Sequence, residues 1–211
     1  FPLSSFPVPA ELIRALAQVK EACSKANVKA GLLDETIGRA IVQAAQEVAK
    51  GLLADQFIVD AFQGGAGTST NMNMNEVLAN RALEIMGASK GDYGLVHPLH
   101  HVNLSQSTND VYPTALKVAA IGLVLALSEA VARLQGAFQE KEAAFAGVLK
   151  LGRTEMQDAL PITLGQEFGA FAEALARDRW RLFKVEERLR QGNLGGTAVG
   201  TGLNAERTYI Y

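Results

Sequence analysis

The 211-residue sequence contains very little cysteine, and this shortage limits its chemistry. Cys23 is the single cysteine, which excludes an internal disulfide and a cysteine-rich zinc site. Three histidines are present, but no cysteine or carboxylate clusters beside them at the spacing of metal ligands. We therefore expect a protein of the reducing cytoplasm, with neither a metal nor a cofactor.

The sequence also lacks a strong excess of charge and a long hydrophobic run. Lys and Arg total 20 and Asp and Glu total 22, so neither nucleic acid nor an acidic membrane is an expected partner. The first residues lack the basic start and apolar run of a signal peptide. The most apolar window, Val118–Leu127, is shorter than the roughly 20 residues that span a bilayer. It is predicted to be a buried helix.

Apolar residues recur at helical spacing along most of the chain. One such stripe covers 10–27 and is followed by Gly31; Asp34 then stands at the N-cap position of a second stripe, which ends at Gly51. These two segments predict a helical hairpin. Further helices are predicted over 76–86, 112–148 and 163–190. No segment alternates with a period of two, so the predicted class is all-α with strands minor at most.

The two longest predicted helices are too apolar for one chain to cover. Charged residues are sparse between Tyr112 and Arg133, and a helix that is apolar nearly all round must be covered on every side. A chain of this length can hardly cover that helix and also the one over 163–190. We therefore expect these helices to pack against other copies of the chain in a homo-oligomer.

Three segments next to the predicted helices are crowded with hydroxyl and amide side chains: 64–70, 105–110 and 152–158. Such groups, together with the free backbone N–H groups of a helix N-terminus, stabilise carboxylates or phosphates. Helix capping would explain any one of these segments. Three of them, each with more polar groups than a cap uses, favour anion binding. The glycine-rich segment 64–67 is no nucleotide site, because a third glycine, a preceding strand and a lysine are all missing.

Four motifs, in order, resemble signatures of the aspartase/fumarase superfamily, and together they cover nearly the whole chain. They are FQGGAGTS with NMNMNEV over 62–77, HVNLSQSTND over 101–110, GRTEMQDA with LGQEF over 152–168, and the glycine turn GGTAVGTG over 195–202. The resemblance implies a helical N-terminal domain, present in part as residues 1–106. Residues 107–211 would then belong to a central domain of long antiparallel helices, a bundle that tetramerises.

Within the superfamily, the segment Gln-Gly-Gly-Ala-Gly-Thr-Ser is similar to aspartases, whereas fumarases usually carry Gly-Ser-Gly-Thr-Gln there. The resemblance thus implies an aspartate ammonia-lyase, which eliminates ammonia from L-aspartate to give fumarate through an aci-carboxylate intermediate. Its partners would be a small dicarboxylate substrate and the other subunits of a homotetramer, which share each active site. A class II fumarase and a catalytically inert helical oligomerisation fragment are the alternatives.

The resemblance also implies which residues form the site. Six residues would bind the substrate carboxylates: Thr68, Ser69, Ser107, Thr108, Asn109 and Thr154. Thr154, from a neighbouring subunit, and Glu155, which stands where relatives have His or Gln, would act in catalysis. His97 would belong to a secondary anion site, although Leu99 and His100 depart from the family's Asn and Asp. The family's general base is a serine on a Gly-Ser-Ser loop, a motif that this sequence lacks. The chain alone is therefore expected to be catalytically incomplete.

Overall fold

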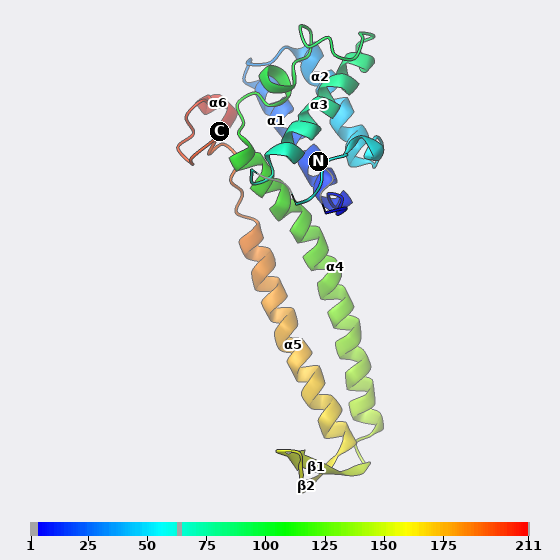
Figure 1. Ribbon diagram of the computed structural model, residues 1–211. Coiled ribbons are helices and arrows are strands. Elements are labelled where there is room, and N and C mark those ends of the chain that lie inside the picture. The colour runs from blue at the N-terminus through cyan, green and yellow to red at the C-terminus, as the bar shows by residue number, and fades with distance from the viewer. Residues whose placement is uncertain (1–3, 63–64, 211) are drawn as a thin grey trace. The chain divides into compact units, whose positions relative to one another are not determined.

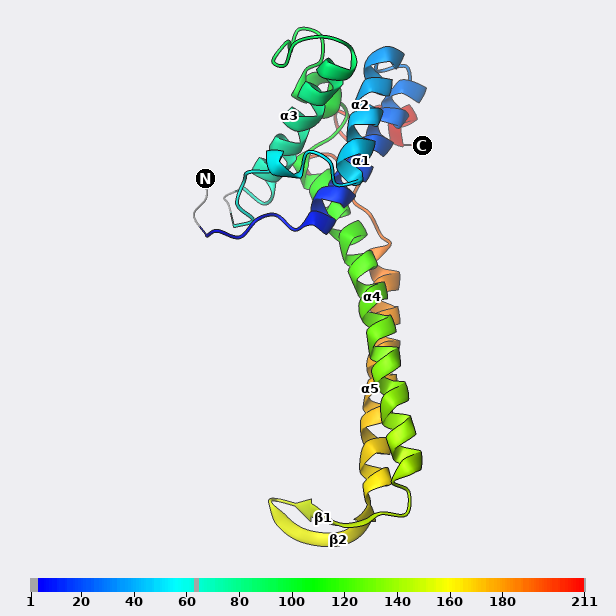
Figure 2. The same ribbon diagram turned by 90° about the vertical axis from the view of Figure 1, so that its right-hand side faces the viewer.

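The computed structural model describes residues 4–62 and 65–210, in which the regular structure is helical apart from one two-stranded sheet (Figures 1 and 2). This confirms the predicted all-α class. The elements follow in the order α1 (Ala10–Lys29), α2 (Glu35–Ala49), η1 (Ala54–Gln56), α3 (Thr68–Ile85), η2 (Pro98–Val102), α4 (Thr108–Ala144), β1 (Leu149–Thr154), β2 (Gln157–Thr163), α5 (Leu164–Leu189) and α6 (Arg207–Ile210).

The chain forms two units. The first contains the residues up to Ala119 together with those from Gln191 onwards, and the second is Ala120–Arg190. The division into a partial N-terminal domain, 1–106, and a partial central domain, 107–211, stays a prediction.

Helices α1 and α2 form the predicted hairpin, with α3 packed against α2 (Figure 1). The Asp34 side chain caps α2 by accepting hydrogen bonds from the backbone N–H groups of Thr36 and Ile37, at 2.8 and 3.1 Å. Gly31 and Gly51 follow the two helices with φ of 73° and 89°, the left-handed conformation that ends many helices. Cap and end signals in the sequence therefore placed these helices correctly.

The hydrophobic core of the first unit lies among α1, α2 and α3. Leu16, Ile41, Leu78 and Leu83 are completely buried, one or two from each helix. Close packing of such side chains removes their apolar surface from water, the main favourable contribution to folding. This core fixes the positions of the loops between the helices.

Helix α3 begins at Thr68, eight residues before the predicted start at 76, so the prediction of a loop there was wrong. Its first turns present polar side chains to the interior, among them Asn71 and Asn75, so that no apolar stripe marks the helix in the sequence. Gly67 precedes α3 with φ of 89°, and a Cβ at this position would lie 2.4 Å from the Tyr112 ring. Only glycine permits that contact. Gln63 and Gly64 of the first motif lie outside the described residues.

The predicted burial of helix α4 does not occur within the single chain. The window 118–127 was predicted to be buried, but Leu123 and Leu127 are 54% and 50% exposed, because the described residues of this chain do not cover them. In the described part of the chain, α4 is long and apolar enough to cross a membrane by length and composition, and 6% of its most apolar window is buried. A single helix that meets this test is weak evidence for a membrane span.

The second unit consists of the later part of α4, a β-hairpin and α5. Phe138 lies 5.7 Å, between ring centroids, from both Phe168 and Phe171. A Cβ at Gly165 would lie 2.6 Å from the Glu142 carbonyl oxygen, so glycine permits the close approach of α5 to the end of α4. Helix α5 begins with a capping box in which Thr163 and Gln166 satisfy each other's backbone N–H groups.

Strands β1 and β2 pair antiparallel from Leu149 opposite Thr163 to Thr154 opposite Gln157. The sequence predicted a polar loop over 152–158 and missed this hairpin. Most of its residues are exposed on both faces, so burial imposes no alternating pattern on the sequence. The two turn residues, Glu155 and Met156, have φ of 52° and 63° and lack the Asn-Gly signature of such turns.

Candidate functional site

Three of the predicted site residues form one turn at the start of α4. Ser107, Thr108 and Asn109 are consecutive, and the turn is closed by a hydrogen bond from the Ser107 N–H to Asp110 Oδ1 at 3.0 Å. The backbone N–H of Asn109 donates to Ser107 Oγ at 3.2 Å. Ser107 and Thr108 are half-buried and Asn109 is exposed. The turn thus presents two hydroxyls and an amide at a helix N-terminus, where the helix dipole favours anions.

The glycine turn over 195–202 packs on this same turn. Asp110 is 1% exposed, and its Oδ2 accepts a hydrogen bond from the Thr197 backbone N–H at 2.9 Å. Asn109 Nδ2 donates to the carbonyl of Ala198 at 2.8 Å. The Asp110 carboxylate therefore accepts hydrogen bonds within the protein. One of them connects the start of α4 to a segment almost 90 residues further along the chain.

Asn71 joins the start of α3 to the start of α4. Its Nδ2 donates to Thr108 Oγ1 at 2.9 Å. Because the Thr108 oxygen accepts this hydrogen bond, its own hydroxyl proton remains available to an anion. Thr68 and Ser69 lie on the first turn of α3, one turn before Asn71, and the Thr68 hydroxyl donates to the Gly65 carbonyl at 2.6 Å. The structure therefore links two of the three predicted polar segments through Asn71, which the sequence argument had not singled out.

A buried lysine lies next to these residues and was also missed. Lys20 of α1 is 0% exposed, and its Nζ donates to Asn103 Oδ1 at 2.9 Å and to Gln106 Oε1 at 2.8 Å. Burial lowers the pKa of Lys20 to about 7, and the nearby Cys23 and Asp110 oppose this shift. The available signal was its spacing, because Lys20 falls four residues after Leu16 on the buried face of α1.

His97, the predicted secondary anion residue, caps the short helix η2. Its Nδ1 accepts hydrogen bonds from the backbone N–H groups of Leu99 and His100 at 3.0 and 3.3 Å. The ring proton is therefore on Nε2, which leaves one donor for an anion. Burial lowers the pKa of His101, and its electrostatic interactions with His97 and His100 lower it further. Within 4–62 and 65–210, no group of three or more His, Cys, Asp or Glu side chains could hold a metal ion.

Thr154 and Glu155 lie in the second unit, at the tip of the β-hairpin, and both are exposed. A cavity of about 500 Å³ is lined by Thr154 and its neighbours on the hairpin and α5. Two ion pairs belong to this region, Lys150 with Glu167 at 2.7 Å and Arg153 with Asp158 at 3.1 Å. Within this unit Thr154 and Glu155 are thus placed on a surface open to a partner.

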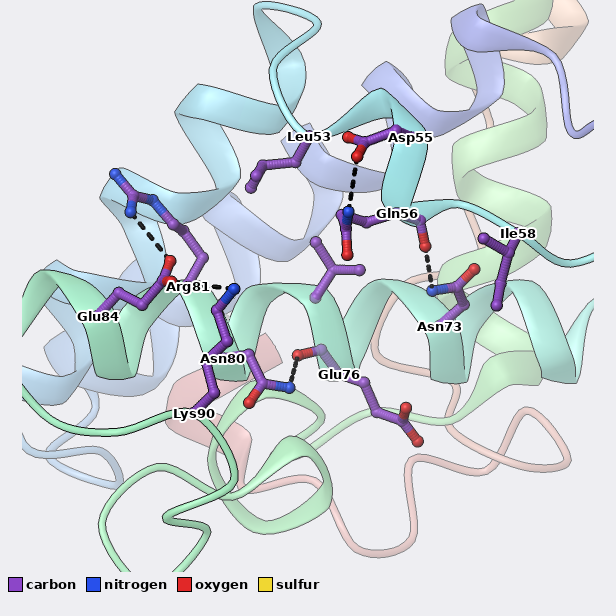
Figure 3. A pocket seen from close by; sticks show the side chains of 11 residues that line it. Leu53, Asp55, Gln56, Ile58, Asn73, Glu76, Asn80, Arg81, Glu84 and Lys90 are labelled. Carbon is purple, nitrogen blue, oxygen red and sulfur yellow. Dashed lines mark hydrogen bonds and ion pairs between the residues drawn. The ribbon is translucent and has the colours of Figure 1, made fainter.

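Figure 3 shows a different cavity, of about 450 Å³, on the first unit between η1 and α3. Three of its charged groups are in ion pairs: Arg81 Nε lies 2.6 Å from Glu47 Oε2, and Lys90 Nζ lies 3.0 Å from Glu84 Oε1. The hydrogen bond from Lys90, and to a smaller extent the one from Arg81, lowers the pKa of Glu84. None of the predicted site residues lines this cavity, so it is not assigned to the site.

Comparisons with known proteins identify the family of the chain. The sequence pattern of a family described as "Lyase" matches residues 3–211. A protein from Bacillus sp named aspartate ammonia-lyase is 52% identical over 210 residues, which are 100% of this chain and 45% of that protein. The chain therefore spans less than half the length of the curated relatives that it matches.

Solved structures give the same result. The cobalt-bound fumarate lyase:delta crystallin from Brucella melitensis is 53% identical, has a TM-score of 0.94, and covers 99% of this chain with 46% of its own. The class II fumarase from Schistosoma mansoni is 36% identical with a TM-score of 0.93, over 99% of this chain and 44% of its own. With the family pattern matched over nearly its full length, the chain belongs to the lyase family, in the aspartase/fumarase superfamily.

Proposed function

We propose that this chain supplies substrate-binding parts of an aspartate ammonia-lyase, which converts L-aspartate into fumarate and ammonia. The observation that carries the proposal is the turn Ser107–Asn109, whose hydroxyl and amide groups point to a carboxylate ligand. It is supported by identities of about 50% to proteins named aspartate ammonia-lyase, from Bacillus and from other bacteria. The substrate of this proposal is a small dicarboxylate.

The turn would act by stabilising negative charge as it develops. Removal of a proton from the carbon next to the β-carboxylate places a second negative charge on that group, an aci-carboxylate; the carbon–nitrogen bond then breaks and ammonia leaves. Donors fixed where this charge develops are usually the largest electrostatic contribution to such a reaction. Thr68, Ser69, Ser107, Thr108 and Asn109 would be these donors, with the Thr68 hydroxyl turning to the substrate from the Gly65 carbonyl, to which it donates in this structure. The Asp110 and Asn71 hydrogen bonds support their preorganisation.

The remaining predicted residues have more limited roles in the proposal. Thr154 would bind a carboxylate, and Glu155 beside it would attract the substrate's ammonium group. Their place on an exposed hairpin tip supports a site completed by another subunit. His97 would hold an anion through Nε2 at a secondary site. The proposal assigns the general base to none of these residues.

The proposal includes a homotetramer in the cytoplasm, with α4 and α5 in a shared bundle. The exposed apolar side chains of Leu123, Leu127, Phe183 and Trp180 support this assembly, because apolar surface on this scale is usually covered by a partner. The single free cysteine, Cys23, supports a reducing location.

A class II fumarase, which interconverts malate and fumarate, is the second candidate. The class II fumarase structure from Schistosoma mansoni favours it, but at 36% identity rather than about 50%.

Because the two reactions share fumarate and differ in the other compound, one experiment separates them. Because this chain alone is expected to be catalytically incomplete, the complete protein that contains it is incubated with L-aspartate or with L-malate, and fumarate is measured. We expect fumarate from L-aspartate alone, with Thr108→Val lowering the rate at least about 100-fold. Fumarate from malate alone would rule out the ammonia-lyase.

A further inference from the structure

We propose that Lys20 is a positioning residue for the turn Ser107–Asn109, which it holds in place through Asn103 and Gln106. The inference deepens the proposed function and rests on it in one respect, since it takes this turn to bind a dicarboxylate. In the described structure, Lys20 makes no hydrogen bond to the hydroxyl groups of the turn itself, so its effect on them is indirect.

The burial of Lys20 is the first reason to look for a role. A lysine on the buried face of an amphipathic helix is unfavourable unless its amine is hydrogen-bonded, and an apolar residue of similar length would fill the same space. Lys20 is completely buried, and its Nζ reaches residues 83 and 86 positions away along the chain. Both partners lie within the five residues that precede Thr108.

The hydrogen bonds lead from Lys20 to the turn in two ways. Asn103 Oδ1, which accepts from Lys20, also accepts from Asn71 Nδ2 at 3.2 Å, and the same Nδ2 donates to Thr108 Oγ1 at 2.9 Å. Gln106 is bonded to Lys20 through Oε1, while its Nε2 donates to the Val102 and Leu104 carbonyls at 3.0 Å each. Gln106 directly precedes Ser107. Lys20 therefore holds the residue before the turn directly, and it holds the Asn103 oxygen to which the amide that orients the Thr108 hydroxyl also donates.

The local balance of donors and acceptors shows what the loss of Lys20 would do. Asn103 Oδ1 also accepts from Asn75 Nδ2 at 3.2 Å, so one oxygen with two lone pairs receives three donors. Among the described residues, the Oδ1 atoms of Asn71 and Asn75 are buried and have no hydrogen-bond partner. Without the Lys20 amine, the Asn103 oxygen would keep two donors. Gln106 Oε1 would lose its bond to Nζ, a cost for a half-buried acceptor.

The charged and titratable groups around Lys20 come from three elements. Cys23 lies on α1 itself, Asp110 lies on α4, and Tyr209 of α6 donates its hydroxyl hydrogen to Cys23 Sγ at 3.2 Å. Burial raises the pKa values of Cys23 and Tyr209, so near neutral pH Asp110 is the anion that faces Lys20. The pKa of Lys20 is about 7. The protonated amine makes charge-assisted hydrogen bonds, so it holds Asn103 and Gln106 more firmly than the neutral amine does.

The test compares Lys20→Met with a matched control, Lys25→Met. Lys25 lies on the same helix, but its side chain is 60% exposed and pairs with Glu21. Fumarate is the probe; its affinity is measured by calorimetry, and hydrogen–deuterium exchange is measured over 103–110. We expect Lys20→Met to bind fumarate at least about tenfold more weakly, with faster exchange over 103–110 and unchanged exchange in α2. Lys25→Met should match the original protein. Unchanged fumarate affinity and unchanged exchange in Lys20→Met would overturn the proposal.

The pH dependence separates positioning from a purely structural role. A bound dianion favours the protonated amine, so fumarate affinity should weaken as the pH rises through about 7, and this step should be absent in Lys20→Met. A lysine that contributed stability alone would leave the pH dependence of affinity unchanged, and this result would also overturn the proposal. If Lys20→Met does not fold, Gln106→Leu takes its place, because it removes one of the two Nζ contacts and keeps the other.

The proposed function and the positioning role can fail separately. If the original protein neither binds fumarate nor forms it from L-aspartate, the proposed function fails. The exchange measurement then decides the positioning role by itself: faster exchange over 103–110 in Lys20→Met supports it, and unchanged exchange overturns it. If the original protein binds fumarate but Lys20→Met binds it equally well across the pH range, the positioning role alone fails.

Discussion

The two units of this chain stabilise their helices in different ways. The first unit buries Leu16, Ile41 and Leu78 completely among α1, α2 and α3, whereas Ala172, at 3% exposed, is the one buried hydrophobic side chain in Ala120–Arg190. Both units have long apolar stretches. The difference teaches that apolar composition alone does not say whether a helix is covered by its own chain or by another.

The largest expected effect concerns the core of the first unit. Ile41→Ala should lower the free energy of unfolding by about 2–5 kcal/mol, because it leaves a cavity at a completely buried position. Leu134→Ala, at a position 48% exposed on α4, is the control and should change the stability of the isolated chain by less than about 0.5 kcal/mol. Urea unfolding at low protein concentration measures both. Equal losses would remove the distinction between the two units.

The converse effect should appear in self-association. Leu123→Glu together with Leu127→Glu places two charges on the exposed apolar surface of α4, and we expect the association to weaken by about 2 kcal/mol or more. Leu52→Glu, at a residue 55% exposed in the first unit, should leave association unchanged. Sedimentation over a range of concentrations gives the masses. An unchanged mass for the double variant would mean that another surface holds the copies together.

A pH effect of intermediate size should belong to the first unit. The pKa of Lys20 falls from 10.5 to about 7 on folding, so between these values the unfolded chain binds more protons, and stability contributed by Lys20 rises with pH. From pH 7 to 9, the difference in unfolding free energy between the original protein and Lys20→Met should rise by at most about 2.7 kcal/mol. The difference between the two proteins is compared, rather than the stability of one, because the raised pKa values of Cys23 and Tyr209 lower the stability of both at high pH. A flat difference would contradict this account.

The smallest expected effect concerns the second unit, which has few buried side chains and in which a cap fixes the start of α5. Thr163→Ala removes the side chain that caps α5 and should lower stability by about 1 kcal/mol. Exchange at the start of α5 should increase with it. Thr201→Ala, at an exposed residue of the glycine turn, is the control. If Thr163→Ala leaves the exchange of residues 164–167 unchanged, the start of α5 is fixed by contacts other than its cap.

The sequence predicted those parts of the fold that local signals determine. Asp34, Gly31 and Gly51 marked the ends of α1 and α2 correctly, because caps and left-handed residues act within a few positions. The start of α3 was missed because Asn71 and Asn75 are buried by hydrogen bonding to distant residues. The β1–β2 hairpin was missed because neither face is covered in this chain, so no alternation arises.

The candidate site could be predicted only in part for the same reason. Ser107, Thr108 and Asn109 are adjacent in sequence, so their proximity was already implied. The roles of Asn71 and Lys20 depend on contacts more than 35 residues away, which no local pattern contains. How Thr154 and Glu155 complete the site, and the tetramer that would bring them there, stay predictions.

Gly67 sets a limit on how freely the start of α3 can be altered by engineering. Any side chain at this position would have to adopt a φ of 89° and displace the Tyr112 ring, and with it the spacing of α3 and α4 across which Asn71 reaches Thr108. Gly87 has a similar φ of 76° but open space around it. In a saturation library screened for turnover, position 87 should therefore accept asparagine and aspartate, whereas position 67 should return glycine from every surviving clone.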